Sequence, residues 1–401
     1  MQATGSNNFS PRPIDPPRAA ARHADHGSMI LHQRARDIGL PFPGTPGPFN
    51  AITDVPGVEV GFTTLKSLAS NGRPQIYTGV TAVLPRGHAQ VPHPVWAGQF
   101  DLNGNGEMTG THWVRDAGYF QGPICLTNTH SVGIVHHAAV GWMIDRYARE
   151  LRDAWGWAMP IVAETYDGLT NDICGRHITE QHARHALDSA RPGPIEEGNV
   201  GGGTGMQTYE FKGGTGTSSR MFAIAGRTHT VGVLVQSNFG VRREFNLLGV
   251  PVGQYMTGNA VISELGLPET GSIIVLIATD APVSPVQLRR LAKRGALGLG
   301  RTGTSGGHYS GDLILSFSVA NPVYLPPIGQ PQPHSFTLDW LNDAHCDSIY
   351  GPTVEAIEEA IINAMIAAES VPTIRPPGRV LQAIDHRELL EVMRARRPLR
   401  P

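Results

Sequence analysis

Residues 270–280 read Thr270-Gly271-Ser272-Ile273-Ile274-Val275-Leu276-Ile277-Ala278-Thr279-Asp280. A polar turn ends in glycine, and serine then opens an unbroken aliphatic run, which predicts a strand that is buried on both faces. Ser272 therefore stands at the mouth of a central strand, and Gly271 tolerates backbone angles that other residues cannot adopt. The simplest interpretation of this stretch alone is an ordinary turn serine at the start of a core strand.

The same junction also allows the chain to cleave itself. If the Ser272 hydroxyl attacked the Gly271 carbonyl, the chain would break there and Ser272 would gain a free α-amine. Such an amine titrates at about pH 8, so at neutral pH it can act as a base beside its own hydroxyl. The stretch thus indicates either a turn or an N-terminal nucleophile.

The composition narrows the class of protein. The 401 residues are 40% hydrophobic and carry a net charge of -2, which gives no basic surface for nucleic acid or an anionic membrane. No apolar run approaches the length of about 18 residues that spans a membrane. Three widely spaced cysteines argue against a disulfide framework and for a reducing, cytoplasmic compartment.

The N-terminus differs in composition from the rest of the chain. Residues 1–32 are rich in Pro, Arg, Asn and Ala and lack the apolar region of a secretory signal. We therefore expect a disordered extension over residues 1–32, followed by a single catalytic domain over residues 33–401.

Hydrophobic periodicity predicts strands and helices along the whole domain. Strands are expected at 58–62, 79–84, 124–126, 160–164, 220–225, 228–236, from 272 onward and at 313–319. Helices are expected at 133–155, 179–190, after Ser284-Pro285, at 353–368 and at 387–395, with loops at 87–99 and 250–267. The order lacks the regular βαβ rhythm of a doubly wound fold, so we expect an α/β or α+β architecture with helices outside sheets.

The sequence does not support three familiar kinds of functional motif. The glycine-rich stretches 198–205 and 211–218 carry neither phosphate-binding fingerprint. Residues 303–307 match G-x-S-x-G, but a helix precedes and a strand follows, which reverses the hydrolase elbow. Seventeen histidines include no H-E-x-x-H, so the sequence indicates no metal and no organic cofactor.

A second serine stands at another strand mouth. Ser310-Gly311-Asp312 precedes the strand expected at 313–319. Residues i and i+2 of a strand share a face, so Ser310 and Asp312 can point into one site. Beside Ser272 such a pair could relay a proton in acyl transfer, although a turn feeding a strand explains it equally.

Three further polar residues end apolar strands. Asn238 and Tyr166 are uncharged donors that could stabilise an oxyanion. Glu164 is an acid that could pair with a substrate ammonium. Each residue taken alone is more often structural.

Together these blocks resemble one known family, the DmpA-type L-aminopeptidase/D-amino-acid esterases and the bacterial β-aminopeptidases. The resemblance extends from Arg34 to about Ala368. The matching blocks, in order, are Arg34 to Asp37, Gly44 to Pro48, Ile52 to Val58, Asn103 to Trp113, Ala163 to Gly168, Glu197 to Met206, Phe211 to Arg220, Asn238 to Gly240, Gly249 to Gly253, Gly271-Ser272 and Ser310 to Asp312.

The resemblance implies a self-cleaving serine aminopeptidase or amidase. The precursor would cut itself between Gly271 and Ser272, giving a large subunit, 1–271, and a small subunit, 272–401. The fold would be a four-layer αββα sandwich, similar in its layers to N-terminal nucleophile hydrolases. Substrates would be small peptides, amino acid amides or esters, without a cofactor, and members assemble as homotetramers of cleaved heterodimers.

The resemblance also implies a role for each candidate residue. Ser272 would be the nucleophile, and Ser310 with Asp312 would complete the group that handles protons. The β-aminopeptidases have glutamate where Asp312 stands, so the reach of this shorter side chain differs. Asn238 and Tyr166 match residues on the oxyanion side, and Glu164 matches the acid that binds the substrate amine.

Alternative functions remain on the same scaffold. An ornithine-type acetyltransferase and a nylon-oligomer hydrolase both resemble this chain but use threonine as the nucleophile, whereas Ser272 is serine. A binding protein that keeps the fold without cleavage is the other alternative. The sequence leaves open whether the substrate is an L-α-, D-α- or β-amino acyl compound.

Overall fold

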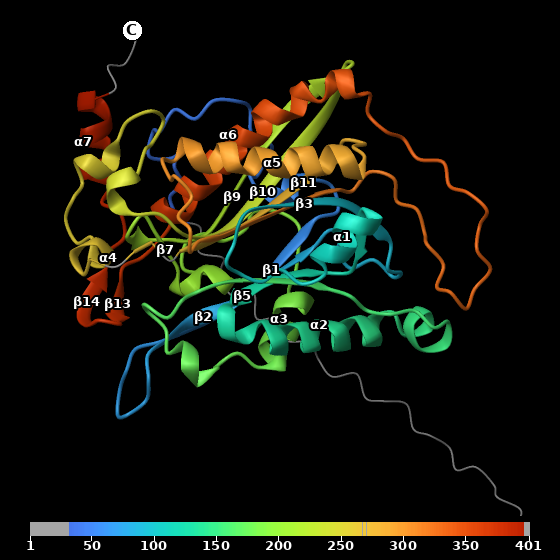
Figure 1. Ribbon diagram of the computed structural model, residues 1–401, viewed down its shortest axis with the longest axis horizontal. Helices are drawn as coiled ribbons and strands as arrows, with labels where there is room; N and C mark the ends of the chain where they lie inside the picture. Colours follow the sequence, from blue (N-terminus) through green and yellow to red (C-terminus); the bar gives the residue numbers. More distant parts are fainter. Residues whose placement is uncertain (1–31, 267, 270, 397–401) are drawn as a thin grey trace, which may run out of the picture. The chain divides into compact units, whose positions relative to one another are not determined.

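Strand β11 (Ser272–Thr279) is buried along its whole length inside a six-stranded sheet (Figure 1). The strand order of this sheet is β4-β3-β12-β11-β10-β9. β11 pairs antiparallel with β10 (Arg227–Asn238) and parallel with β12 (Gly311–Ser318). Its alternate side chains enter two different core clusters, Ile273 in one and Ile274 in the other. The predicted strand with two buried faces is therefore confirmed.

A second, four-stranded sheet packs against the first. Its strand order is β1-β2-β5-β6, and β5 and β6 run parallel. The core between the two sheets combines Val83 and Ile124 of this sheet with Leu276 and Leu315 of the other. The four strands are β1 (Glu59–Ser67), β2 (Ile76–Leu84), β5 (Ile124–Asn128) and β6 (Ile161–Thr165).

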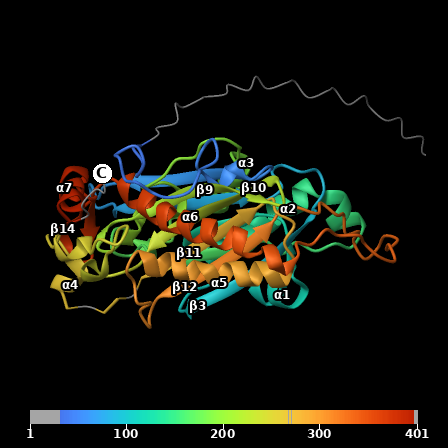
Figure 2. The same ribbon diagram turned by 90° about the horizontal axis from the view of Figure 1, so that it is seen from above.

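Helices cover the outer face of each sheet (Figures 1 and 2). The six-stranded sheet carries α5 (Pro285–Arg301) and α6 (Asp347–Ile366), whose apolar faces share a core cluster with β10 and β11. The four-stranded sheet carries α2 (Val132–Arg146) and α3 (Glu180–Asp188). The layers therefore run αββα, as expected from the sequence.

The computed structural model describes residues 32–266, 268, 269 and 271–396. The extension expected at 1–32 lies outside this range except for His32. No helix within the described ranges is long and apolar enough to cross a bilayer. The remaining strands and α-helices are β3 (Pro94–Gly104), α1 (Thr111–Ala117), β4 (Tyr119–Gln121), β7 (Gln207–Thr208), β8 (Phe211–Lys212), β9 (Gly214–Ile224), α4 (Val261–Glu264), β13 (Val371–Ile374), β14 (Pro377–Leu381) and α7 (His386–Arg396).

Four expectations about secondary structure differ from the structure. Helix α4 lies inside the loop expected at 250–267, and α2 ends at Arg146 and not near residue 155. The other two concern β3 and α6. β3 begins inside the stretch 87–99 that was expected to be a loop. Pro94 stands at its first position, where proline is tolerated, and its far end is largely polar and exposed. α6 begins at Asp347 instead of Thr353 and continues through Pro352. The helix accommodates this proline at the loss of one backbone hydrogen bond, while Ile349 and Val354 on either side are buried.

Candidate active site

Ser272 lies where three strands of the six-stranded sheet meet at their ends. As the first residue of β11, it pairs with Asn238, the last residue of β10, and with Gly311, the first residue of β12. The antiparallel and parallel neighbours therefore bring a carboxamide and a backbone amide to either side of the serine. This arrangement follows from strand register, which the sequence alone does not specify.

The amide of Gly311 contacts both parts of the Gly271–Ser272 junction. Its N–H donates to Ser272 Oγ at 3.1 Å and to the Gly271 carbonyl oxygen at 3.3 Å. A Cβ at Gly311 would lie 2.3 Å from the Asn105 carbonyl oxygen, so glycine is required for this approach. One backbone N–H thus contacts both the Ser272 hydroxyl and the Gly271 carbonyl oxygen, which is the geometry of a donor to an oxyanion at this position.

Ser310 and Asp312 form a buried pair directly beside this amide. Ser310 Oγ donates to Asp312 Oδ1 at 2.6 Å, and Asn103 Nδ2 donates to Asp312 Oδ2 at 3.0 Å. Burial raises the pKa of Asp312, and these two hydrogen bonds oppose that rise. Among the described residues, neither Ser310 nor Asp312 is hydrogen-bonded to Ser272 Oγ. The contact with Asn103 cannot be read from the sequence, since it joins two strands far apart in the chain.

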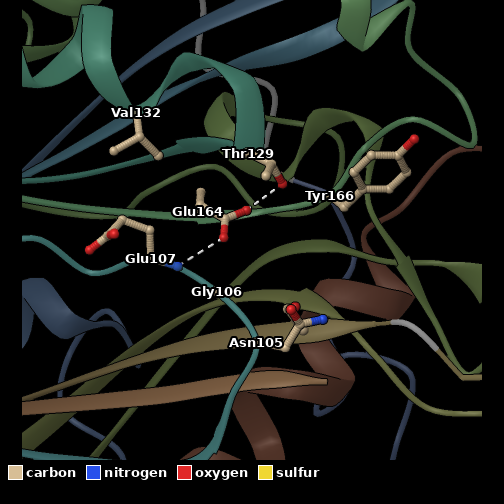
Figure 3. A pocket seen from close by; sticks show the side chains of 8 residues that line it. Asn105, Gly106, Glu107, Thr129, Val132, Glu164 and Tyr166 are labelled. Atoms are coloured by element: carbon tan, nitrogen blue, oxygen red, sulfur yellow. Dashed lines mark hydrogen bonds between the residues drawn. The ribbon is translucent and has the colours of Figure 1, made fainter. Parts of the chain in front are cut away.

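Glu164 approaches from the other sheet, near the end of β6. One of its carboxylate oxygens accepts from the Glu107 backbone N–H at 3.0 Å, and the other accepts from the Thr129 hydroxyl (Figure 3). Burial raises the pKa of Glu164, with the two hydrogen bonds acting against it. Thr129 and the Glu107 amide were missed by the sequence analysis, because only the fold brings them to Glu164.

A pocket with a volume of about 690 Å³ opens at Ser272 and Glu164. Its lining residues are Asn105, Gly106, Glu107, Thr129, Val132, Glu164, Tyr166 and Ser272 (Figure 3). The serine and the buried glutamate therefore open onto the same space, from two different sheets. A molecule that carries both an amine and a carbonyl group can contact both residues within such a pocket.

Asn238 and Tyr166 lie at the site but are linked to each other in an unexpected way. Asn238 Nδ2 donates to the backbone oxygen of Tyr166 at 3.1 Å, and its Oδ1 accepts from Gln207 N–H at 2.9 Å. The Tyr166 ring points away from Asn105 and Glu164 (Figure 3), and its hydroxyl lies 3.3 Å from Arg375 Nη1. The carboxamide is thus held in place by the main chain of Tyr166, while the phenol group is bonded elsewhere.

The site therefore brings together the parts that acyl transfer requires. It contains a serine hydroxyl, a buried serine–carboxylate pair, a backbone donor at the Gly271 carbonyl and a second carboxylate across the pocket. Within the described residues, no three His, Cys, Asp or Glu side chains are placed to hold a metal ion. Nucleophilic attack by serine with proton transfer to a neighbouring carboxylate is the chemistry that these groups support.

Comparisons with known proteins place the chain in a peptidase family. Residues 50–376 match peptidase family S58. The β-peptidyl aminopeptidase BapA of Sphingosinicella microcystinivorans is 45% identical over 380 residues, which cover 91% of this chain and 93% of that protein.

Two solved structures share the fold. The L-aminopeptidase D-Ala-esterase/amidase from Ochrobactrum anthropi, described as a prototype of the serine aminopeptidases and a variant of the Ntn hydrolase fold, is 50% identical with a TM-score of 0.85, covering 90% of this chain and 98% of its own. The β-aminopeptidase of a Burkholderia species is 42% identical with a TM-score of 0.82, covering 92% and 100%.

Proposed function

The chain belongs to peptidase family S58, and on that premise we propose that it is a serine aminopeptidase and amidase that first cleaves itself. It releases N-terminal amino acids from small peptides, amides or esters through an acyl-enzyme on Ser272. One observation carries the proposal, namely that Ser272 and Glu164 line the same pocket. Glu164 binds the free amine of the substrate, which positions the first carbonyl group for attack.

Self-cleavage starts from the uncut junction. Ser272 Oγ attacks the carbonyl carbon of Gly271, while Gly311 N–H stabilises the developing oxyanion. Ser272 has no free amine at this stage, so the Ser310–Asp312 pair takes the hydroxyl proton and returns it to the departing Ser272 nitrogen. The C–N bond breaks, an ester remains, and water hydrolyses it to a Gly271 carboxylate and a free Ser272. The hydrogen bonds from Gly311 N–H to the Ser272 hydroxyl and to the Gly271 carbonyl oxygen support the first of these steps.

Turnover of substrate repeats the same steps on an external carbonyl group. Ser272 Oγ attacks, its own α-amine or the Ser310–Asp312 pair accepts the proton, and the leaving amine receives it. Gly311 N–H and Asn238 hold the oxyanion, and Tyr166 contributes through its backbone oxygen, which orients Asn238. Water then releases the amino acid, and no step requires a cofactor.

The assembly and location are extensions of the proposal. Several large apolar side chains are exposed on the protein, including Val286 and Leu297 of α5 and Trp155 and Trp157 after α2. Exposed apolar side chains such as these are available for subunit contacts. We therefore propose a homotetramer of cleaved heterodimers in the cytoplasm that has neither a nucleic-acid nor a membrane partner. Light scattering coupled to gel filtration tests the subunit number.

Hydrolysis of paired substrates tests the proposed activity. Purified protein is incubated with α- and β-aminoacyl p-nitroanilides, each with a free or an N-acetylated amine. The proposal predicts release of nitroaniline from at least one free-amine compound, much slower release from its acetylated partner, and no release by Ser272→Ala. Equal turnover by wild type and Ser272→Ala would exclude Ser272 as the nucleophile.

A further inference from the structure

Glu269 lies two residues before the Gly271–Ser272 bond and has no part in the mechanism above. Its Oε1 accepts a hydrogen bond from the Gly240 N–H at 2.7 Å. Gly240 has a φ of +85°, in the left-handed region that favours glycine. It ends the short segment 238–240 at the end of β10, which we call the β10 turn. The chain before the junction is thus tied to the same turn that positions the oxyanion residue.

The other carboxylate oxygen of Glu269 occupies a space left by a second glycine. A Cβ at Gly307 would lie 2.5 Å from Glu269 Oε2. Gly307 ends the stretch 303–307, which matches G-x-S-x-G but lacks the context of a hydrolase elbow. In the folded protein, Gly307 of this loop instead packs directly against the Glu269 carboxylate, where a larger residue would clash.

Gly271 provides a second point of attachment to the same turn. A Cβ there would lie 2.4 Å from the Asn238 carbonyl oxygen and 2.5 Å from the Phe239 Cα. The Gly271 backbone therefore lies directly on the turn, and its own carbonyl oxygen accepts from Gly311 N–H at 3.3 Å. Glu269 and Gly271 together hold the uncut chain at both ends of a very short segment.

This carboxylate is placed in an electrostatically unfavourable position. Burial raises the pKa of Glu269, and the nearby carboxylates of Glu244 and Asp312 raise it further, while the hydrogen bond from Gly240 and the charge of Arg243 lower it. A neutral side chain would join the two loops without bringing a further negative charge close to Asp312. The feature of Glu269 that bears on the junction is therefore its hydrogen bond with Gly240, and not its charge.

We propose that Glu269 is a positioning residue for self-cleavage. Its hydrogen bond to Gly240 holds the segment before Gly271 on the β10 turn, which keeps the scissile carbonyl group within reach of Gly311 N–H and Ser272 Oγ. This inference rests on the proposed self-cleavage, and it concerns the cutting step and not the later turnover of substrate. Once the bond is cut, substrate is positioned by the pocket residues and no longer depends on Glu269.

A pulse–chase experiment on the full-length chain tests this role. Labelled protein is made by cell-free translation, and conversion to the two fragments is followed over time for wild type, Glu269→Ala, Glu269→Gln and Glu264→Ala. Glu264 is a matched control because it is an exposed glutamate of the same connecting segment, where it pairs with Arg379 at 2.6 Å. We expect Glu269→Ala to slow cutting at least about tenfold, Glu269→Gln to stay within about threefold, and Glu264→Ala to cut at the wild-type rate.

A second measurement separates positioning from folding. After cutting is complete, kcat/KM of Glu269→Ala on the best aminoacyl anilide is expected to stay within about twofold of wild type. If wild type cuts itself and Glu269→Ala cuts itself at the same rate, the role of Glu269 is overturned and the proposed self-cleavage stands. Equal losses of cutting and mature turnover in Glu269→Ala would also overturn it, in favour of a structural role. A wild-type chain that never cuts overturns both this inference and the proposed self-cleavage.

Discussion

Ser272 and Glu164 lie in different sheets of the sandwich, yet both line a single pocket. Ser272 opens β11 of the six-stranded sheet, and Glu164 lies next to the last residue of β6 in the four-stranded sheet. The facing ends of two strands thus supply the proposed nucleophile and the acid proposed to bind the substrate amine. This relationship makes the roles of the two residues separable by experiment.

Glu164→Gln is expected to weaken substrates with a free amine selectively. A neutral amide keeps the size of the side chain but loses its pairing with the substrate ammonium, which is worth about 1.5–3 kcal/mol for a buried charged hydrogen bond. We predict a fall in kcat/KM of about 10- to 100-fold for aminoacyl anilides, with little change for their N-acetylated partners. Glu107→Gln is the control variant. It removes another carboxylate of the pocket but keeps the backbone N–H that donates a hydrogen bond to Glu164. An equal loss on both substrate types would contradict the role of Glu164.

The pH dependence of that selectivity follows from the raised pKa of Glu164. Burial favours its protonated form, so Glu164 loses its charge at a higher pH than an ordinary glutamate, whose pKa is 4.5. We expect the ratio of kcat/KM for free-amine over N-acetylated substrate to fall as the pH is lowered through this raised value. The ratio cancels the titration of Asp312, which affects both substrates. A ratio that is flat from pH 8 to 4, or unaltered in Glu164→Gln, would contradict this explanation.

Asp312→Asn is expected to impair cutting and turnover together. An amide cannot take up the proton that Ser310 passes on, and the loss of general-base catalysis costs about 100-fold or more. Asn103→Ala removes only one supporting hydrogen bond and should cost about tenfold or less. Rates of fragment formation and of anilide hydrolysis, measured on the same preparations, provide the check. Asp312→Asn protein that cuts at the wild-type rate would rule out this pair as the base.

Because the carboxyl group of Asp167, the residue after Tyr166, is buried, we expect the free energy of unfolding to depend on pH. Asp167 is completely buried, Asn171 Nδ2 donates to its Oδ1 at 3.0 Å, and burial raises its pKa from 3.8 to about 7. Between these values the folded chain keeps a proton that the unfolded chain has lost. Stability therefore falls as the pH rises through this window, by up to about 4 kcal/mol, and this contribution is constant above it.

Asp167→Asn should remove that dependence. We suggest urea unfolding at pH 5, 6, 7 and 8 in the Ser272→Ala background, where each molecule is a single chain. The free energy of unfolding of Asp167→Asn, relative to Asp167, is expected to increase steadily from pH 5 to 7 and then to stay constant. Parallel curves for the two proteins over the whole range would show that Asp167 is ionised in the folded state.

The sequence was informative where the deciding contacts are local. The aliphatic run after Ser272 and the capping pair Ser284-Pro285 predicted β11 and the start of α5, because periodicity and capping depend only on near neighbours. β3 was missed, since Pro94 and its polar end hide a strand that forms through pairing with β12. The early start of α6 was missed because tertiary burial outweighs the proline.

The site shows the same division. Ser310 and Asp312 are two residues apart, so their pairing could be predicted from strand geometry. Asn103 and Thr129 come from distant segments, and no sequence pattern marks their contact with a carboxylate. Tyr166 was expected to act through its hydroxyl, whereas the structure shows its backbone oxygen bound to Asn238. The direction of the Tyr166 side chain depends on the residues that pack around it and not on the residue type.

The most direct test is the intact mass of purified wild-type and Ser272→Ala protein. For wild type, the account predicts two chains whose masses correspond to residues 1–271 and 272–401, apart from any trimming of the N-terminal tail, with serine as the first residue of the small chain. For Ser272→Ala it predicts one uncut chain. A wild-type chain that stays whole over days, or a Ser272→Ala chain that is cut at the same bond, would contradict it.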